Sequence, residues 1–156
     1  MAKAMFAAGC FWGVEEFFRQ LNGIINTRVG YAGGHTKNPT YKEVCKDTTG
    51  HAETVEIEFD PSVISYEALV QFFFDHHNPT TKNRQGPDIG SQYRSIIFYY
   101  SKEEEKSAHK IKTKLEKSKK YRHPIVTEII PATEFYPAED YHQRYLQKRN
   151  ISHCSN

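Results

Sequence analysis

Two different spacings of apolar residues alternate along this chain, and their order limits the folds that it can adopt. Within Gly13 to Leu21 apolar residues recur at i, i+3, i+4 and i+7, which predicts an amphipathic helix. Apolar and polar residues alternate from Ile25 to Tyr31, as in a half-buried strand. The apolar run Ala4 to Ala8 precedes the helix and predicts a first strand. The chain therefore begins as strand, helix, strand.

Both spacings recur towards the carboxyl-terminal end, where three further strands and three further helices are predicted. Ser101 and Glu104 form a capping box that marks the start of one helix. The strands are at about Glu53 to Phe59, Tyr93 to Tyr100 and Ile125 to Ile130, and the other helices begin at Ser65 and near Pro137.

Two long polar segments, residues 32–52 and 78–91, separate these elements and contain Gly, Pro and Asn breakers. A loop of ~20 residues in a compact domain is usually functional or disordered. The order of strands and helices resembles a split β-α-β, ferredoxin-like core. We therefore predict the α+β class, as a ferredoxin-like two-layer α/β sandwich with a mostly antiparallel mixed sheet, long active-site loops and an irregular C-terminal tail.

The length of 156 residues predicts one domain over residues 1–156, with a mobile tail over residues 141–156. Lys and Arg total 21 against 19 acidic residues, so nothing favours nucleic-acid binding. The stretch from Lys110 to Lys120 is interpreted as the solvated face of a helix. No apolar run reaches the ~20 residues of a membrane span, and the N-terminal apolar stretch is too short for a secretory signal. We expect a cytoplasmic protein, or the mature form of a processed one.

Three widely spaced cysteines, Cys10, Cys45 and Cys154, do not form a disulfide framework, and no C-x-x-C pair is present. In a reducing compartment such cysteines are either inert or catalytic thiols. The eight histidines are scattered without ligand spacing, so we predict no metal site.

Cys10 lies where the first strand is expected to turn into the first helix. A thiol at that corner lies beside unpaired helix N–H groups, which favour the thiolate. Phe11 and Trp12 follow it, and Trp12 is the only tryptophan of the chain. The motif suggests a reactive sulfur beside an aromatic wall suited to an apolar methyl or thioether group, with ordinary core packing as the alternative.

Glu53 shares one face of its predicted strand with Val55, Ile57 and Phe59, because residues two apart point to the same side. A carboxyl group at the core-facing end of a strand would be partly desolvated, which raises its pKa and lets it donate a proton near pH 7. A frayed strand end, with Glu53 in water, is the alternative.

Eight sequence blocks, in order along nearly the whole chain, resemble the peptide methionine sulfoxide reductase A family. The first contains Cys10 and matches the active-site signature of that family. The blocks are Gly9-Cys10-Phe11-Trp12-Gly13-Val14-Glu15, Gly30-Tyr31-Ala32-Gly33-Gly34, Asn38-Pro39-Thr40-Tyr41, Val44-Cys45, Thr49-Gly50-His51-Ala52-Glu53, Asp88-Ile89-Gly90-Ser91-Gln92-Tyr93-Arg94-Ser95, Pro137-Ala138-Glu139 and Tyr141-His142-Gln143.

This resemblance implies a single catalytic domain and a role for each matching residue. The catalytic group would comprise Cys10 as nucleophile, Glu53 as acid, Tyr41 and Tyr93 as hydrogen-bond donors and Cys154 as the second thiol, and the substrate-binding group Phe11, Trp12 and Asp88.

The implied reaction is the thiol-dependent reduction of methionine S-sulfoxide, free or in oxidised proteins, through a cysteine sulfenic acid and an intramolecular disulfide. Thioredoxin would be the reductant, no cofactor is expected, and the protein would be a monomer. A helix N-terminus contributes roughly 0.3–1 kcal/mol, less than the about 1.4 kcal/mol of one pKa unit. Cys10 would thus be mostly thiol at pH 7, and we hypothesise a neutral Glu53 in the resting site.

Two thiols compete for the second step. Cys154 lies at the usual resolving position of the family, but lacks the glycines that often surround it there. Cys45 is the competing candidate. Its alternative interpretation is that it serves only as a small buried hydrophobic residue. Two other functions remain open at this point: a thiol peroxidase that uses Cys10, and a non-catalytic module that binds metal or methionine-rich peptide.

Overall fold

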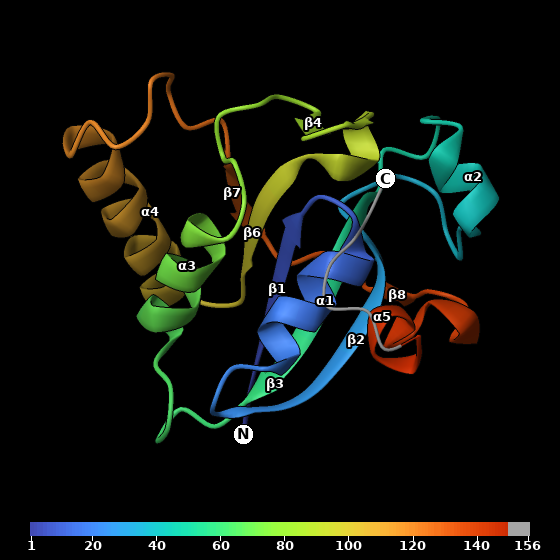
Figure 1. Ribbon diagram of the computed structural model, residues 1–156, viewed down its shortest axis with the longest axis horizontal. Coiled ribbons are helices and arrows are strands. Elements are labelled where there is room, and N and C mark those ends of the chain that lie inside the picture. The colour runs from blue at the N-terminus through green and yellow to red at the C-terminus, as the bar shows by residue number, and fades with distance from the viewer. Residues whose placement is uncertain (150–156) are drawn as a thin grey trace.

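The computed structural model describes residues 1–149, and Cys154 lies outside these residues. Six strands form one sheet in the order β7-β6-β1-β3-β2-β8 (Figure 1). Every neighbouring pair is antiparallel except β6 and β7, which are parallel. The strands are β1 Ala2–Ala8, β2 Ile24–Ala32, β3 Ala52–Phe59, β6 Ser95–Tyr99, β7 Glu128–Pro131 and β8 Tyr136–Pro137. The predicted α+β class with a mostly antiparallel mixed sheet is confirmed, and the ferredoxin-like detail stays a prediction.

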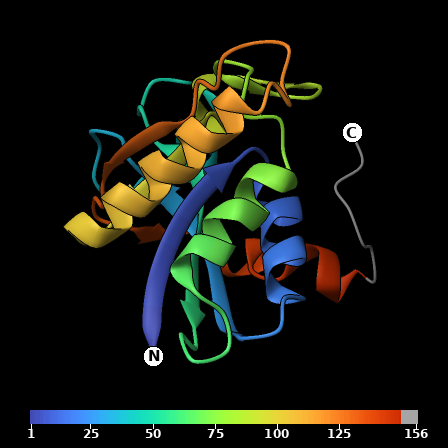
Figure 2. The same cartoon turned by 90° about the vertical axis from the view of Figure 1, so that its left-hand side faces the viewer.

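Three helices, α1 (Phe11–Arg19), α3 (Tyr66–Asp75) and α4 (Lys102–Lys117), pack on one face of the sheet (Figures 1 and 2). The main core lies between them and the sheet. Phe6 of β1 occupies its centre, with its ring 5.3 Å from that of Phe18 and 5.2 Å from that of Phe73. A smaller apolar cluster covers the opposite face of the sheet. Because β1 is buried on both faces, its sequence is a continuous apolar run rather than an alternation.

Several predicted boundaries differ from those observed. The first helix begins at Phe11 rather than Gly13, so Cys10 is its N-cap. The strand expected from Tyr93 begins at Ser95, because Ser91–Tyr93 form a 3-10 turn. The strand expected from Ile125 begins only at Glu128. Each shift moves an end and leaves the element in place.

The helix predicted near Pro137 is wrong. Pro137 belongs to β8, which pairs with Gly30 and Tyr31 of β2 at the edge of the sheet. Proline has no N–H to donate, and an edge strand tolerates this. A 3-10 turn at Asp140–His142 and the helix α5 (Tyr145–Lys148) follow.

Both long loops contain short elements that the apolar spacing did not predict. The helix α2 (Tyr41–Cys45) lies in the first loop and starts at a full capping box of Thr40 and Glu43. The second loop contains the two-stranded hairpin β4 (Arg84–Gln85) and β5 (Asp88–Ile89).

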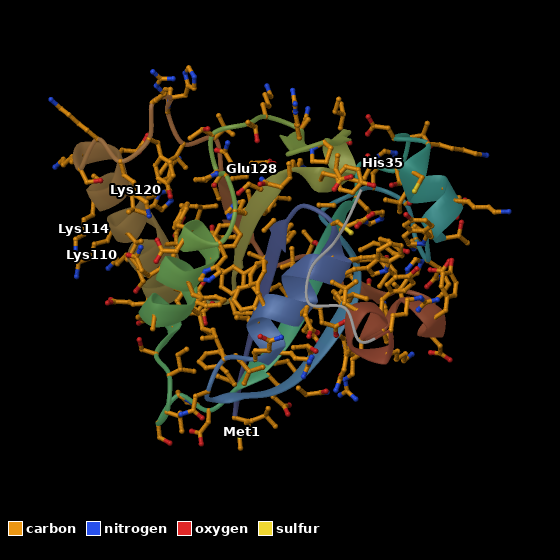
Figure 3. All side chains as sticks on the ribbon, viewed as in Figure 1. Met1, His35, Lys110, Lys114, Lys120 and Glu128 are labelled. Carbon is orange, nitrogen blue, oxygen red and sulfur yellow. The ribbon has the colours of Figure 1, made fainter. Side chains whose placement is uncertain are left out.

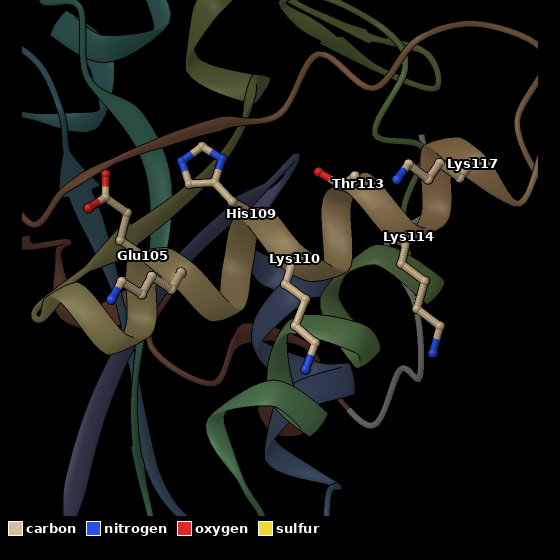
Figure 4. Close-up of a pocket in the computed structure, with 7 residues that line it drawn as sticks. Glu105, His109, Lys110, Thr113, Lys114 and Lys117 are labelled. Atoms are coloured by element: carbon tan, nitrogen blue, oxygen red, sulfur yellow. The ribbon is translucent and has the colours of Figure 1, made fainter.

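The lysine-rich face of α4 is solvated, as predicted. The helix buries Ala108, Ile111 and Leu115 against the core, whereas Lys110 and Lys114 point outwards (Figure 3). The shallow hollow on this helix is lined mainly by lysines and comprises Glu105, Lys106, His109, Lys110, Thr113, Lys114 and Lys117 (Figure 4). No helix within residues 1–149 has the length and apolar composition needed to cross a bilayer.

A hydrogen-bonded chain ties the end of α3 to the sheet. His77 Nδ1 lies 2.6 Å from the carbonyl oxygen of Phe73, which can only accept, so Nδ1 carries the proton. Nε2 then accepts from the hydroxyl of Ser95 at 2.8 Å, and Ser95 lies 2.7 Å from the hydroxyl of Thr127. Burial lowers the pKa of His77 to about 4. The imidazole is therefore neutral in the folded protein at pH 7.

This lowered pKa predicts a loss of stability in mild acid. Between pH 6.5 and 4 the unfolded chain binds a proton at His77 that the folded chain does not, so the free energy of unfolding falls as the pH falls. The full shift would be worth about 3 kcal/mol, and the partial exposure of the residue reduces the expected loss to about 2 kcal/mol. Urea unfolding of wild type and His77→Gln at pH 7, 6, 5 and 4 measures this. The variant should lose less stability than wild type, whereas the exposed His123→Gln should behave as wild type.

Candidate active site

Cys10 occupies the N-cap of α1, at the corner between β1 and the helix. Its carbonyl oxygen accepts the first helical hydrogen bond, from Val14 N at 3.2 Å, and the residue is half-buried. The preceding Gly9 has φ +106°, and a Cβ there would lie 2.7 Å from Cγ of Gln85. The corner therefore needs glycine, and it holds the thiol at the amino-terminal end of the helix.

Glu53 reaches this corner from the neighbouring strand β3. Its Oε1 accepts a hydrogen bond from Phe11 N at 3.1 Å, and the residue is 2% exposed. The carboxyl group thus lies on the helix-facing side of the sheet, as strand parity predicts, and the alternative of a frayed end in water is wrong. Because Phe11 follows Cys10 directly, this bond brings the carboxyl group beside the thiol.

Two tyrosines from the long loops face the same carboxyl group. Tyr41 is the first residue of α2, and Tyr93 ends the 3-10 turn before β6. Burial raises the pKa of both phenols far above the ordinary value, and an ionised Glu53 would raise it further. Both hydroxyls therefore stay protonated and can donate hydrogen bonds at physiological pH.

An aromatic wall lies against the first turn of α1. The ring of Phe11 lies 6.4 Å from that of Tyr41 and 5.2 Å from that of His142. Trp12 stacks on Tyr145 with a centroid distance of 3.8 Å and an interplanar angle of 7°. The indole Nε1 of Trp12 donates to Nδ1 of His142 at 2.9 Å.

The tail segment contributes residues to which sequence reasoning assigned no role. Glu139 accepts from the hydroxyl of Tyr31 at 3.0 Å and from Tyr41 N at 3.1 Å, so it links the sheet to α2. His142 and Tyr145 hold Trp12. Glu139 and His142 lie within blocks that resemble the family, and this resemblance is the one indication in the sequence that they have a role. No local pattern indicates it, because their partners are far away in the sequence.

Asp88 and Cys45 lie at the edge of this group. Asp88, in β5, is half-buried, and its charge contributes to the raised pKa of Tyr93. Cys45 is exposed and hydrogen-bonds to the side chain of Tyr41, so its interpretation as a buried hydrophobic residue is wrong. Partial burial of its thiol raises the pKa of Cys45.

Seven of the eight residues predicted for the site are therefore described, and they gather around the start of α1. They are Cys10, Phe11, Trp12, Tyr41, Glu53, Asp88 and Tyr93. Within the described part of the chain no three His, Cys, Asp or Glu side chains are placed to hold a metal ion. The group combines a thiol, a carboxyl group, two phenols and an apolar wall. Such an arrangement can attack an atom that carries both a polar oxygen and an apolar substituent, and protonate that oxygen.

Comparison with known proteins shows which families and structures this chain is similar to. The family model described as peptide methionine sulfoxide reductase matches residues 2–156. A peptide methionine sulfoxide reductase MsrA of Methanosarcina mazei is 57% identical over 151 residues, which are 97% of this chain and 72% of the relative.

Two solved structures of Mxr1 from Saccharomyces cerevisiae are similar in fold. The reduced form has a TM-score of 0.90 at 39% identity and covers 98% of this chain and 88% of its own. Mxr1 in complex with Trx2 has a TM-score of 0.65 at 29% identity and covers 92% of this chain and 84% of its own.

Proposed function

This chain belongs to the peptide methionine sulfoxide reductase family, and from that premise we propose that it reduces methionine S-sulfoxide, free or in proteins, to methionine. The proposal depends above all on one observation, the hydrogen bond from Phe11 N to the buried carboxyl group of Glu53. This bond puts an acid beside the thiol of Cys10. A thiol reduces a sulfoxide readily only if the leaving oxygen is protonated, and here both groups are next to each other.

The aromatic wall supports a substrate of this shape. A methionine sulfoxide carries a methyl group on the same sulfur as its polar oxygen. Trp12 is half-buried and offers an apolar surface for the methyl group, and the buried ring of Phe11 extends the apolar wall beside it. A methyl group packs well against aromatic faces. Tyr41, Tyr93 and Glu53 offer polar groups for the oxygen.

The helix alone cannot activate Cys10. A helix N-terminus is worth roughly 0.3–1 kcal/mol, less than the about 1.4 kcal/mol that shifts a pKa by one unit. An ionised carboxylate at Glu53 would raise the cost of a thiolate further. We therefore place a neutral carboxyl group at Glu53 in the resting site. Its Oε1 can still accept the N–H of Phe11 as the carbonyl oxygen of a neutral acid, in a weaker hydrogen bond than a carboxylate would make.

The first chemical step transfers oxygen from one sulfur to the other. The sulfur of Cys10 attacks the sulfoxide sulfur while Glu53 protonates the oxygen and Tyr41 and Tyr93 donate hydrogen bonds to it. The hydroxyl group then passes to the sulfur of Cys10 as the S–O bond of the sulfoxide and the transient S–S bond break. Methionine leaves with its sulfur reduced by two electrons, and Cys10 becomes a sulfenic acid, oxidised by two electrons. The thiol proton returns to the carboxylate of Glu53. Asp88 lies beside Tyr93 and orients that phenol or the substrate.

The second step restores the thiol. A second thiol attacks the sulfenic sulfur, forms a disulfide with Cys10 and releases water. A dithiol reductant then reduces the disulfide, and we propose thioredoxin, because the similar protein Mxr1 is known in complex with Trx2. We also propose a cytoplasmic location, because the three widely spaced cysteines of the sequence do not form a disulfide framework.

Separate epimers of a methionine sulfoxide substrate test the function. With dithiothreitol as reductant, wild type should consume the S epimer and leave the R epimer, and Cys10→Ser should consume neither. Product methionine is measured by chromatography. Activity on the R epimer alone would overturn the assignment. Peroxide consumption without sulfoxide reduction would indicate a thiol peroxidase, and normal sulfoxide binding by Cys10→Ser without turnover by wild type would indicate a binding module.

Glu53→Gln tests the acid. The amide keeps the shape and can still accept from Phe11 N, but it has no acidic proton, so the single-turnover rate should fall about 10²- to 10⁴-fold. The dissociation constant of the substrate should change by no more than about three-fold, because binding depends mainly on the aromatic wall. Rapid-quench measurement of methionine formation gives the rate. Glu58→Gln, on the opposite face of the same strand, is the control, and a Glu53→Gln rate equal to that of Glu58→Gln would exclude the acid role.

The second thiol is proposed to be Cys154, which lies outside the described residues. The raised pKa of Cys45 lowers its thiolate fraction, which slows its attack on the sulfenic sulfur. After one turnover without reductant, peptide mapping should find a disulfide between Cys10 and Cys154. Cys154→Ser should still release one methionine per chain but lose thioredoxin-dependent turnover, whereas Cys45→Ser should keep both. A disulfide between Cys10 and Cys45, or a stable sulfenic acid in wild type, contradicts this.

A further inference from the structure

One fully enclosed polar ring beside the catalytic helix has no part in the proposed chemistry. His142 ends the 3-10 turn Asp140–His142 and is 1% exposed. Its ring lies 4.5 Å from that of Tyr41, 5.2 Å from that of Phe11 and 5.6 Å from that of Trp12. An apolar side chain would fill this space without the cost of burying two nitrogens.

The protonation of the ring follows from its partner. The indole Nε1 of Trp12 can only donate, so Nδ1 of His142, at 2.9 Å, is the acceptor and carries no proton. The neutral ring therefore carries its proton on Nε2, which is buried and has no hydrogen-bond acceptor within residues 1–149.

We propose that His142 is a positioning residue for sulfoxide reduction, which fixes the plane of Trp12, and hence the methyl-binding wall, by accepting the indole N–H. The proposal rests on the proposed function, in which Trp12 contacts the substrate methyl group. The hydrogen bond from Nε1 to His142 holds the indole ring of Trp12 at one edge, and the stacked ring of Tyr145 holds it on one face. Two contacts of different kinds leave the indole a single orientation.

The segment that carries His142 is itself anchored on both sides. The next residue, Gln143, accepts from Val29 N at 2.9 Å and donates to the carbonyl oxygens of Val29 and Ala138 at 2.9 and 3.0 Å. Arg144 N donates at 2.7 Å to Glu15 of α1, a carboxyl group that is 1% exposed. The acceptor of the indole N–H is thereby held against both the sheet and the catalytic helix.

The charges around the ring keep it neutral at pH 7. Burial lowers the pKa of His142, and the opposing effect of the carboxylate of Glu139 is smaller. Glu139 stays ionised because its own pKa is lowered, and the phenols of Tyr41 and Tyr141 stay protonated because theirs are raised. Three further carboxyl groups lie near this wall: Glu53 accepts from Phe11 N, Glu15 accepts from Arg144 N, and Asp140 belongs to the same turn as His142. Protonation of His142 would remove the acceptor of the indole N–H.

A pair of substitutions tests the acceptor. His142→Leu fills the space without an acceptor, and His142→Asn places its Oδ1 close to the position of Nδ1. We expect kcat/KM for the S-sulfoxide to fall about ten-fold in the Leu variant, mostly through KM, and to stay within about three-fold of wild type in the Asn variant. His109→Leu, the same change at an exposed residue of α4, is the control. Equal kcat/KM in the folded Leu variant and in wild type would overturn the proposal, as would equal losses in the Leu and Asn variants.

Fluorescence of Trp12 provides a second measurement. It needs no substrate and compares only wild type with the His142→Asn variant. Because Trp12 is the only tryptophan, the emission of the whole protein reports its surroundings. Wild type should show one change of emission as the pH falls, with a midpoint below 6.5, and His142→Asn should not. A change that persists in His142→Asn belongs to another group, such as Glu53, and overturns the proposal. If His142→Asn loses this change of emission but wild type does not reduce the sulfoxide, the hydrogen bond between His142 and Trp12 is established and the proposed function is contradicted.

Discussion

The structure depends on one hydrogen bond between two elements that are 42 residues apart, from Phe11 N to the carboxyl group of Glu53. Cys10 makes no side-chain hydrogen bond of its own as N-cap, so the carboxyl group takes the place of a capping side chain. One contact thereby satisfies a helix donor, buries an acid and sets the distance between acid and thiol. The chemistry proposed here needs all three results together.

The second half of the site is built by the tail. Residues 139–145 bring a carboxylate to the backbone of α2, an imidazole to the indole of Trp12 and a phenol ring to its face. None of these groups touches the reacting atoms in the proposed mechanism. They determine where the loop tyrosine and the aromatic wall lie, and the small distances that separate a productive from an unproductive pose depend on such support.

Much of this arrangement could be predicted from local patterns. Strand parity places Glu53 on the helix side, and helical spacing places Cys10 at the start of α1, because both depend only on nearby residues. The strand at Pro137 could not be predicted, since its pairing with β2 is a long-range contact. Trp12 and His142 are 130 residues apart, and no spacing of residues in the sequence predicts a contact between them. The helix α2 differs, because its capping box at Thr40 and Glu43 is local, but the polar segment around it has no apolar spacing that predicts a helix.

The two ends of the described chain meet at the aromatic wall, and this has a consequence for biosynthesis. Trp12 leaves the ribosome well before His142 and Tyr145, which emerge only after the described strands of the sheet have been synthesised. A nascent chain thus exposes its thiol long before the pocket beside it exists. The wall is complete only once residues 139–145 have been synthesised, and a fragment that stops before residue 139 carries the reactive cysteine without the wall that selects its substrate.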